Sequence, residues 1–360
     1  MTNLAVAADP ETAPRVAPPN LAGWHPSSWV GPLVVAALTF GLWLAALAIG
    51  VLTPQWWARL ALVVPLTLFS GQLFTLGHDA AHGSFSTSRT LNAVVGRLAF
   101  LPTVHVFGLW CFHHDLHHRF TNLRGRDFVW TPLTVDEFRA LSRPRRWLHR
   151  LERHRSGLGL GWHYAVEIWA PRMLWPRRRY EVPDRRRFVV DALVLYGLLF
   201  GLGVMAWGVV AAVDHGRLGD FGSWISAAVF LFALPLIGTQ WLIGFVIYLN
   251  HTHPDVRWFD DVEEWARHDV QLEGTAAQRF RRLGPPLPRR IMSHTAHHVD
   301  PGVPLPALRA AQQQLIDRFG DRIVHWDWSP RRFHTILAKC KLYDYDTHQW
   351  VTYDAAGETT

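Results

Sequence analysis

Eleven of the 21 histidines fall into four short clusters, and these clusters are the residues best suited to chemistry. Two clusters contain the pattern HxxHH, a third has the pattern HxxxH, and the fourth is the segment NHTH. On a helix, residues i, i+3 and i+4 lie on one face, so each HxxHH pattern directs three imidazole rings toward one point. Imidazole is a ligand for zinc, copper, iron and nickel. The spacing therefore predicts a metal centre.

The clusters supply more imidazole groups than one metal ion needs. They comprise His78 and His82 in HDAAH, His113, His114, His117 and His118 in HHDLHH, His251 and His253 in NHTH, and His294, His297 and His298 in HTAHH. A tetrahedral zinc site takes four ligands, so two ions with several histidines each fit better. Ferritin-like di-iron proteins use Glu-x-x-His ligands, and no such motif lies near the clusters. The residues predict a dinuclear, imidazole-rich centre and leave the metal open.

Four uncharged apolar runs must position these clusters. They are Gly31–Leu52, Leu60–Gly77, Ala192–Val213 and Phe221–Leu249. A hydrocarbon core about 30 Å thick needs roughly 20 apolar residues of helix, so each run predicts a membrane-spanning helix. The apolar segment Leu91–Phe112 is interrupted by Arg97 and His105 and is expected to lie in the interface or to re-enter. The expected fold is all-α, with four transmembrane helices and a cytoplasmic helical cap that carries the histidine clusters.

The basic residues predict the orientation of the spans. Of the 36 lysines and arginines, 33 lie in two long segments, His78–Arg187 and Asn250–Thr360. The positive-inside rule places both segments and the N-terminus in the cytoplasm of a bacterial-type inner or plasma membrane. The net charge of +7 then indicates contact with anionic lipid headgroups rather than with nucleic acid, because no nucleic-acid fold signature accompanies it.

Three regions are expected along the chain. Residues 1–30 are acidic and proline-rich at the start and predict a disordered or interfacial tail, with no cleavable signal peptide. Residues 31–305 form the membrane domain, and residues 306–360 form a cytoplasmic C-terminal segment. Within the cap, Asp136–Arg155 and Pro306–Phe319 are expected to be helical.

The clusters resemble the three histidine boxes of the integral-membrane fatty acid desaturases and related hydroxylases. HDAAH, HDLHH and HTAHH match the boxes, and the segment YLNHTHPD at Tyr248–Asp255 resembles the sequence that precedes the third box in plant Δ12-type and bacterial acyl-lipid desaturases. HHRFTN after the second box is similar to the same branch. The resemblance covers roughly Leu73–Pro304 and includes the arrangement of two plus two spans.

This resemblance implies a non-haem centre of two iron ions that uses O2 and two electrons to desaturate an acyl chain. By the family pattern the metal ligands are His78, His82, His114, His117, His118, His251, His294, His297 and His298. Two alternatives stay open: His113 gives an HxxxHH pattern as in the alkane-hydroxylase branch, and His253 is an alternative to His251. Asp79 and Asp115 suit hydrogen bonds to ligand histidines, and the role of Asn250 is open.

The chain must obtain its electrons from another protein. It has no Rossmann fingerprint, no fused cytochrome b5-like HPGG, and only the cysteines Cys111 and Cys340, too few for an iron–sulfur cluster. The expected partners are a ferredoxin or another reductase, attracted by the arginine-rich cap, and the lipid bilayer. The expected substrate is an acyl lipid, an acyl-CoA or an acyl-carrier-protein thioester.

Two other functions compete with desaturation. The same centre could serve a hydroxylase, a carotenoid ketolase or hydroxylase, or an alkene-forming decarboxylase. A membrane metal transporter is a different class, but transporters place polar ligands at mid-membrane within broken helices. The four apolar runs contain no histidine, which disfavours transport.

Overall fold

In the computed structural model, the chain packs into two compact units, each assembled from separate stretches of sequence. The structure describes residues 19–180, 182–213, 221–280 and 288–357. Unit 1 comprises Met1–His25, His113–His163 and Phe245–Thr360, and unit 2 comprises Pro26–Phe112 and Tyr164–Gly244. Residues 306–360 therefore belong to the same unit as the third box rather than forming a region of their own.

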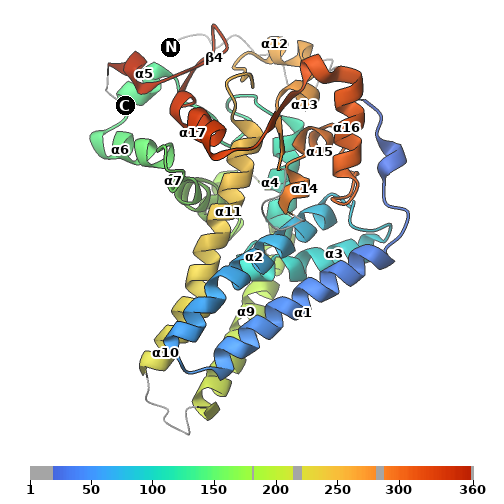
Figure 1. Cartoon of the computed structure of the whole chain (residues 1–360), viewed down its shortest axis with the longest axis vertical. Coiled ribbons are helices and arrows are strands. Elements are labelled where there is room, and N and C mark those ends of the chain that lie inside the picture. Colours follow the sequence, from blue (N-terminus) through green and yellow to red (C-terminus); the bar gives the residue numbers. More distant parts are fainter. Residues whose placement is uncertain (1–18, 181, 214–220, 281–287, 358–360) are drawn as a thin grey trace. The chain divides into compact units, whose positions relative to one another are not determined.

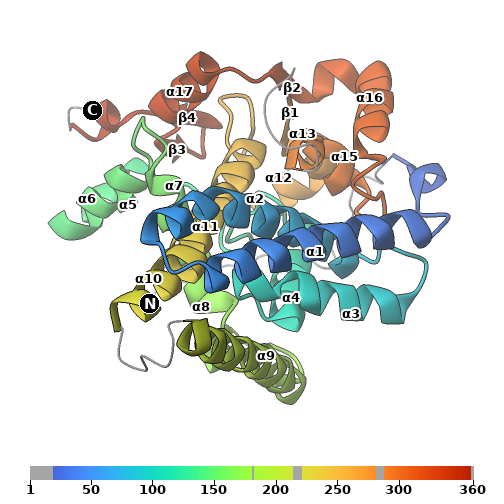
Figure 2. The ribbon, with the colours of Figure 1, turned by 60° about the horizontal axis from the view of Figure 1, so that its bottom comes forward.

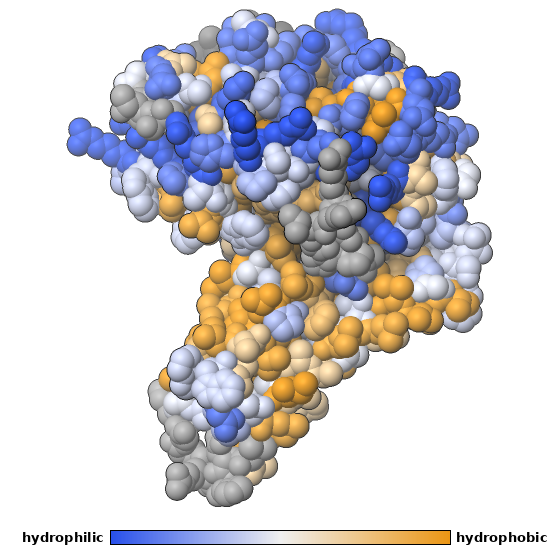
Figure 3. Space-filling model, in the orientation of Figure 1, coloured by the Kyte–Doolittle hydropathy of each residue, from blue (hydrophilic) through white to orange (hydrophobic). Residues whose placement is uncertain are grey.

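Four helical segments in the described residues are long and apolar enough to cross a membrane, as the sequence predicts. They are α1 (Val30–Leu52), α2 (Trp56–Ala81), α9 (Arg185–Val213) and a final segment that runs through α10 (Phe221–Ala228), a π-helical turn and α11 (Leu234–His251). In unit 2 these helices expose large apolar side chains, including Leu38 and Phe200. The visible surface over α1 and α2 is mainly hydrophobic in Figure 3. Such a surface suits hydrocarbon rather than water.

The helices α1 and α2 lie side by side in unit 2 (Figures 1 and 2). The Nε2 of Gln72 on α2 donates to the Oγ1 of Thr39 on α1 over 2.6 Å. At the other end, the buried Arg59 donates to the carbonyl oxygens of Gly50 and Ser223. These buried polar bonds hold α2 in register, and α2 carries the first histidine box at its C-terminal end.

The interrupted apolar segment forms two helices joined by a sharp bend. α3 (Arg89–Ala99) is followed by a short turn and by α4 (Phe107–Arg119), and the helical axes differ by 95°. Arg97 pairs with Asp191 at 2.8 Å, and Asp191 also accepts the backbone N–H of Gly108. His105 bridges the Thr103 hydroxyl and the Tyr164 hydroxyl, at 2.9 Å each. The polar residues that interrupt the run thus hold the bend, and one straight span is excluded.

Unit 1 is mainly helical but also contains strands, so the expectation of an all-α chain is wrong in this detail. The strands β1 (Ala276–Arg279) and β2 (Val324–Asp327) pair in parallel, and β3 (Leu342–Asp344) and β4 (Gln349–Val351) pair antiparallel. The helices of unit 1, besides the ends of α4 and α11, are α5 (Val135–Ala140), α6 (Arg143–Glu152), α7 (Gly159–His163), α12 (Val262–Arg267), α13 (Val270–Glu273), α14 (Pro288–Ile291), α15 (His294–Val299), α16 (Leu308–Phe319) and α17 (Pro330–Lys339). The short α8 (Ala170–Arg172) lies in unit 2.

The two helices expected in the cap have different outcomes. Residues 306–319 contain α16, as expected. Residues 136–155 form two helices instead of one, because α5 ends at Ala140 and α6 restarts at Arg143 with a proline in its first turn. A proline is tolerated at a helix start and disfavours the helical conformation in the residue before it.

The described end of the N-terminal segment is ordered and belongs to unit 1. Leu21 is buried in the hydrophobic core of this unit, and Trp24 donates to the Oε1 of Gln314 over 2.7 Å. His25 contacts the Asp300 carboxylate at 2.8 Å. Of the expected disordered or interfacial tail, residues 19–25 are thus packed against unit 1, and residues 1–18 lie outside the described residues.

Candidate metal centre

The helical spacing of the second and third boxes is realised in unit 1. His114, His117 and His118 lie in the last two turns of α4, and His294, His297 and His298 lie in α15. Every residue of α15 is buried. His251 is the last residue of α11 and is also buried. The i, i+3, i+4 spacing thus directs histidines from three helices into one interior cluster, as expected.

The seven imidazole groups in unit 1 are in close mutual contact. The Nε2 of His118 lies 3.0 Å from the Nε2 atoms of both His114 and His297. The Nε2 of His251 lies 3.2 Å from that of His117 and 2.9 Å from that of His294. The rings of His118 and His298 stack with their centroids 4.2 Å apart. Two nitrogens that bind the same ion at about 2.0–2.1 Å are separated from each other by roughly 3.0–3.4 Å. The distances between these Nε2 atoms therefore suit pairs of histidines that bind a common metal ion.

One group within this cluster brings together three ligand atoms. The ligand atoms of His117, His251 and His298 all lie within 4.8 Å of one another, and all three residues are buried. The Nδ1 of His117 faces the Asp127 carboxylate at 2.9 Å. The Nδ1 of His298 faces the Thr121 hydroxyl at 3.2 Å and the Gln271 amide oxygen at 3.3 Å. These partners occupy Nδ1 and leave Nε2 of both rings for a metal.

The electrostatics of the cluster favour the neutral, metal-binding form of imidazole. Burial lowers the pKa of His298 well below its usual value, and the neighbouring His118, His294, His251 and His117 lower it further. A low pKa keeps the ring unprotonated at neutral pH, and only the unprotonated nitrogen can bind a metal ion.

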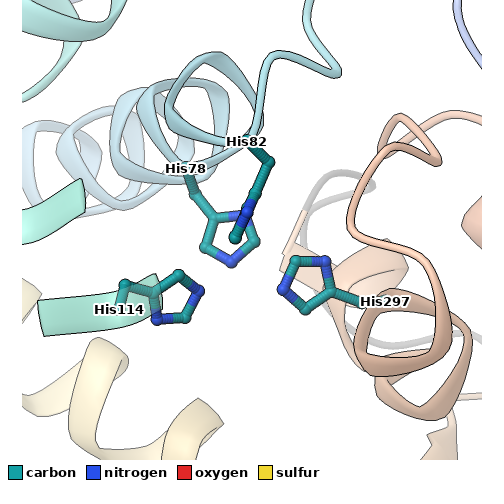
Figure 4. A group of neighbouring side chains, drawn as sticks. All are labelled: His78, His82, His114 and His297. Carbon is teal, nitrogen blue, oxygen red and sulfur yellow. The ribbon is translucent and has the colours of Figure 1, made fainter. Parts of the chain in front are cut away.

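In unit 2 the first box lies at the end of α2. His78 and His82 project from this helix, with their ring centroids 4.9 Å apart, and both are labelled in Figure 4. The Asp79 carboxylate is buried, 3.7 Å from the Nδ1 of His78. The Trp110 ring packs against both histidines. The first box therefore presents two imidazole groups from adjacent turns of one helix.

The residues of unit 1 fit a metal in a further respect. The Nε2 of His298 is buried and has no hydrogen-bond partner within the described residues. Both side-chain atoms of Asn250, which is fully buried, also have no partner within those residues. Buried polar atoms in native proteins are almost always satisfied. A metal ion with its bound water would satisfy such atoms, and neutral imidazole suits iron as well as zinc.

The structure separates the alternative residues from the cluster. His113 is buried against the edge of the Phe128 ring and is not in any group of neighbouring ligand atoms among the described residues. His253 contacts the Asp255 carboxylate at 3.3 Å and stacks on Trp326. Asp115 is exposed on α4, with no hydrogen bond to a histidine in the described part of the chain. The expected role of Asp115 as a partner of a ligand is therefore not seen.

Three residues that contact the clustered histidines were not predicted from the sequence. Asp127, Thr121 and Gln271 hold the Nδ1 atoms of His117 and His298. Asp127 lies beyond the second box in an irregular turn, where helical spacing carries no information. In the sequence Asp127 is marked only by being a carboxylate close to the second histidine cluster. Asp115, which lies within that cluster, is marked in the same way.

We expect Asp127→Asn to lower metal affinity about 10–100-fold, a typical effect of losing a carboxylate that orients a ligand histidine. Asp127 also accepts the backbone N–H groups of Asn122 and Val129, each at 2.9 Å. An asparagine would turn its NH2 group toward one of these three donors. The measurement is the metal content of detergent-purified protein after dialysis against a chelator series. Asp115→Asn, on the exposed face of the same region, is the control and should retain its metal. Equal metal retention by both variants would contradict the assignment of Asp127.

Comparisons with known proteins agree with the box pattern. A family described as "Fatty acid desaturase" matches residues 54–330 of the chain. The chloroplastic omega-6 fatty acid desaturase of Glycine max is 27% identical over 88% of this chain and 69% of its own length. The corresponding protein of Spinacia oleracea is 28% identical over 89% of this chain and 66% of its own length. The sn-1 oleoyl-lipid 12-desaturase of Anabaena variabilis is 27% identical over 89% of this chain and 85% of its own length. The chain thus spans about two thirds of these plant relatives and more of the cyanobacterial one.

Proposed function

Because the chain belongs to the fatty acid desaturase family and is therefore an oxidoreductase, we propose that it introduces a carbon–carbon double bond into an acyl chain of a membrane lipid. The reaction converts –CH2–CH2–, O2, two electrons and two protons into –CH=CH– and two molecules of water. The observation that carries the proposal is the cluster of seven imidazole groups in unit 1, of which six are buried and that of His114 is half-buried. An oxidation centre whose ligands were only carboxylates or only cysteines would not need seven clustered histidines.

The proposed centre holds two iron ions. Its ligands are the nine histidines of the family pattern: His78, His82, His114, His117, His118, His251, His294, His297 and His298. When bound, the two irons supply the oxidation by O2 that no side chain can perform on an unactivated methylene group. Asp127 holds the ring of His117, and Thr121 and Gln271 hold the ring of His298, each through the Nδ1 atom. The buried surroundings exclude water from the centre.

An acyl lipid is the substrate class that the membrane-spanning helices support. Unit 2 contains an apolar pocket of about 260 Å³ between α1, α9 and α10. Its walls are leucine, alanine and tryptophan side chains, among them Trp43, Leu202 and Leu231. A pocket of this composition accepts hydrocarbon. The named relatives include lipid desaturases that act on an oleoyl lipid, which is consistent with an acyl chain esterified in the bilayer.

The two electrons come from a separate protein, a ferredoxin or another reductase. The two cysteines are too few for an iron–sulfur cluster, and burial raises the pKa of the Cys340 thiol far above its usual range. Cys340 is therefore an inert core residue rather than a redox group. The visible surface of unit 1 in Figure 3 is mainly hydrophilic, and the segment His113–His163 of that unit carries ten arginines against five carboxylates. A positive surface suits an acidic electron donor.

The strongest competing function is another oxidation at the same centre. A hydroxylase, a carotenoid ketolase or a decarboxylase would use the same ligands and differ only in how the substrate lies. The names of the relatives favour desaturation. The box histidines end helices rather than interrupt them at their middle, which disfavours a metal transporter.

The test of function is the fatty acid profile of a bacterial host that expresses the gene. We expect a new monounsaturated or diunsaturated acyl species in the membrane lipids, detected by mass spectrometry. The His297→Ala variant, expressed to the same level, should give the profile of the empty host. A hydroxylated or shortened product from the unaltered chain would favour one of the competing oxidations.

The basic residues predict that both termini and the centre face the cytoplasm. Reporter fusions at Gly216 and at Thr360 should therefore report opposite sides of the membrane, because an odd number of spans separates them. The measurement compares a reporter active only in the cytoplasm with one active only outside it. Reports from the same side would contradict four spans with a cytoplasmic centre.

A further inference from the structure

Unit 1 contains a pocket of about 640 Å³ that the metal centre does not use. It is lined by the parallel strands β1 and β2, by α14 and α16, and by the first turn of α17. Figure 2 shows β1 and β2 next to each other, with α16 nearby. A pocket of 300–1,000 Å³ is the usual size for an organic ligand. Its volume is therefore larger than a bare inorganic ion requires.

The charged residues of the pocket are mostly positive. Four arginines line it, and the single carboxylate is that of Asp327. Asp327 is already engaged, because its Oδ1 accepts from the Nε of Arg279 over 2.6 Å. The guanidinium groups of Arg290 and Arg309 make no hydrogen bond or ion pair within the described residues. Guanidinium groups recognise phosphate through paired hydrogen bonds, so the pocket is suited to a phosphate-bearing anion.

Two donors among the lining residues are also unsatisfied. Gln312 is 5% exposed, and its Oε1 accepts the backbone N–H of Ala296 at 2.9 Å, which turns its Nε2 away from that bond. The Nε2 of Gln312 and the indole N–H of Trp326 are buried and have no acceptor within the described residues. Buried donors without an acceptor are rare in native proteins. An anion in the pocket would supply acceptors for them after a side-chain rotation that brings these donors to the pocket surface.

We propose that this pocket binds an organic phosphate. The phosphate oxygens accept hydrogen bonds from Arg290, Arg309 and the Nε2 of Gln312. The organic part packs against the apolar wall formed by Ile316 and Trp326. Two sources carry this chemistry, the headgroup of an anionic phospholipid and a soluble phosphate ester, and the experiment below separates them.

The pocket is connected to the metal-binding elements through two glutamines. Gln312 holds the backbone of α15 at Ala296, the residue before His297. The Nε2 of Gln278 donates to the carbonyl oxygen of Leu249, two residues before His251. A ligand in the pocket therefore contacts side chains that fix two of the histidine-bearing segments. Binding of a ligand in the pocket should therefore raise the stability of unit 1.

The test uses native mass spectrometry of the full chain purified in detergent. The probes are phosphatidylglycerol, diacylglycerol as the matched lipid without phosphate, and glycerol 3-phosphate. We expect saturable retention of one phosphate-bearing molecule per chain and no retention of diacylglycerol. If phosphatidylglycerol is retained and glycerol 3-phosphate does not displace it, the natural ligand is a lipid headgroup. Retention of glycerol 3-phosphate alone identifies a soluble ester. Absence of saturable retention in both arms overturns the proposal.

Matched variants locate the site. Arg290→Ala/Arg309→Ala should weaken the retention about tenfold or more, whereas Arg318→Ala/Arg331→Ala removes the same charge outside the pocket and should change it less than about twofold. Gln312→Glu keeps an acceptor for Ala296 but repels an anion, and Gln314→Glu on the same helix is its control. An equal loss in test and control variants would show general charge attraction and would overturn the proposal. Because binding is measured without turnover, the result does not depend on desaturation.

Discussion

The His298→Ala variant should lose desaturation entirely, and its iron content should fall below the two ions per chain that we expect for the unaltered protein. His298 lies in the middle of the cluster of unit 1. Its ring is stacked on His118 at 4.2 Å and lies 4.7 Å from that of His294. Removal of this ring deletes a ligand and leaves Thr121 and Gln271 without their imidazole partner. No other histidine side chain in the buried helix α15 can take its place, because His294 and His297 are themselves in the cluster.

The measurement pairs iron per mole of purified protein with unsaturated product per mole of membrane-inserted protein. Insertion depends on apolar helix length, which the change does not alter. His334→Ala removes an exposed histidine on α17 and should keep both its iron and its activity. A His298→Ala variant with full iron content and full activity would exclude His298 as a ligand. One zinc and no iron in the unaltered protein would exclude the di-iron centre.

The fold was predictable where one physical requirement dominated the sequence. Uncharged runs of spanning length have few alternatives to a membrane helix, so all four spans were expected. The bounds of α1 were expected to within one residue, whereas α2 extends four residues beyond its run at each end and α9 begins seven residues before its run. The bend between α3 and α4 was signalled by Arg97 and His105, which interrupt an apolar run. The strands β1 and β2 gave no such signal. Each is four residues long, and they pair across 48 positions of sequence, from Ala276 to Val324.

In the site, only the contacts between histidines of the same helix could be predicted, because helical periodicity relates residues within one helix. Spacing brought His114 and His118 together, and it did the same for His294 and His298, because each pair lies on one face of one helix. The partners of the ligands come from turns and from other helices, where spacing carries no information. Asp115 and Asp127 are both aspartates near the second box. Only the tertiary structure shows that Asp127 faces His117, whereas Asp115 is exposed.

The second box contains a pair of adjacent histidines whose variants should differ sharply. We expect His114→Ala to be inactive and His113→Ala to keep substantial activity. Adjacent residues point about 100° apart on a helix. The His114 Nε2 lies 3.0 Å from that of His118, one turn later, and its ring is nearly parallel to that of His297. His113 instead packs its ring against the edge of Phe128. Loss of His114 removes a ligand, and loss of His113 removes a packing contact.

The two variants delete the same side chain one residue apart, so each is the control for the other. His113 is buried, and its replacement by alanine leaves a cavity that should lower the thermal stability without removing iron. The measurement is product and iron per mole of inserted protein, with the apparent melting temperature of each variant. An inactive His113→Ala together with an active His114→Ala would assign the ligands to the HxxxHH pattern of the alkane-hydroxylase branch. That result would require α4 to turn by about one residue relative to α15, which the contacts of His114 and His118 with His297 oppose.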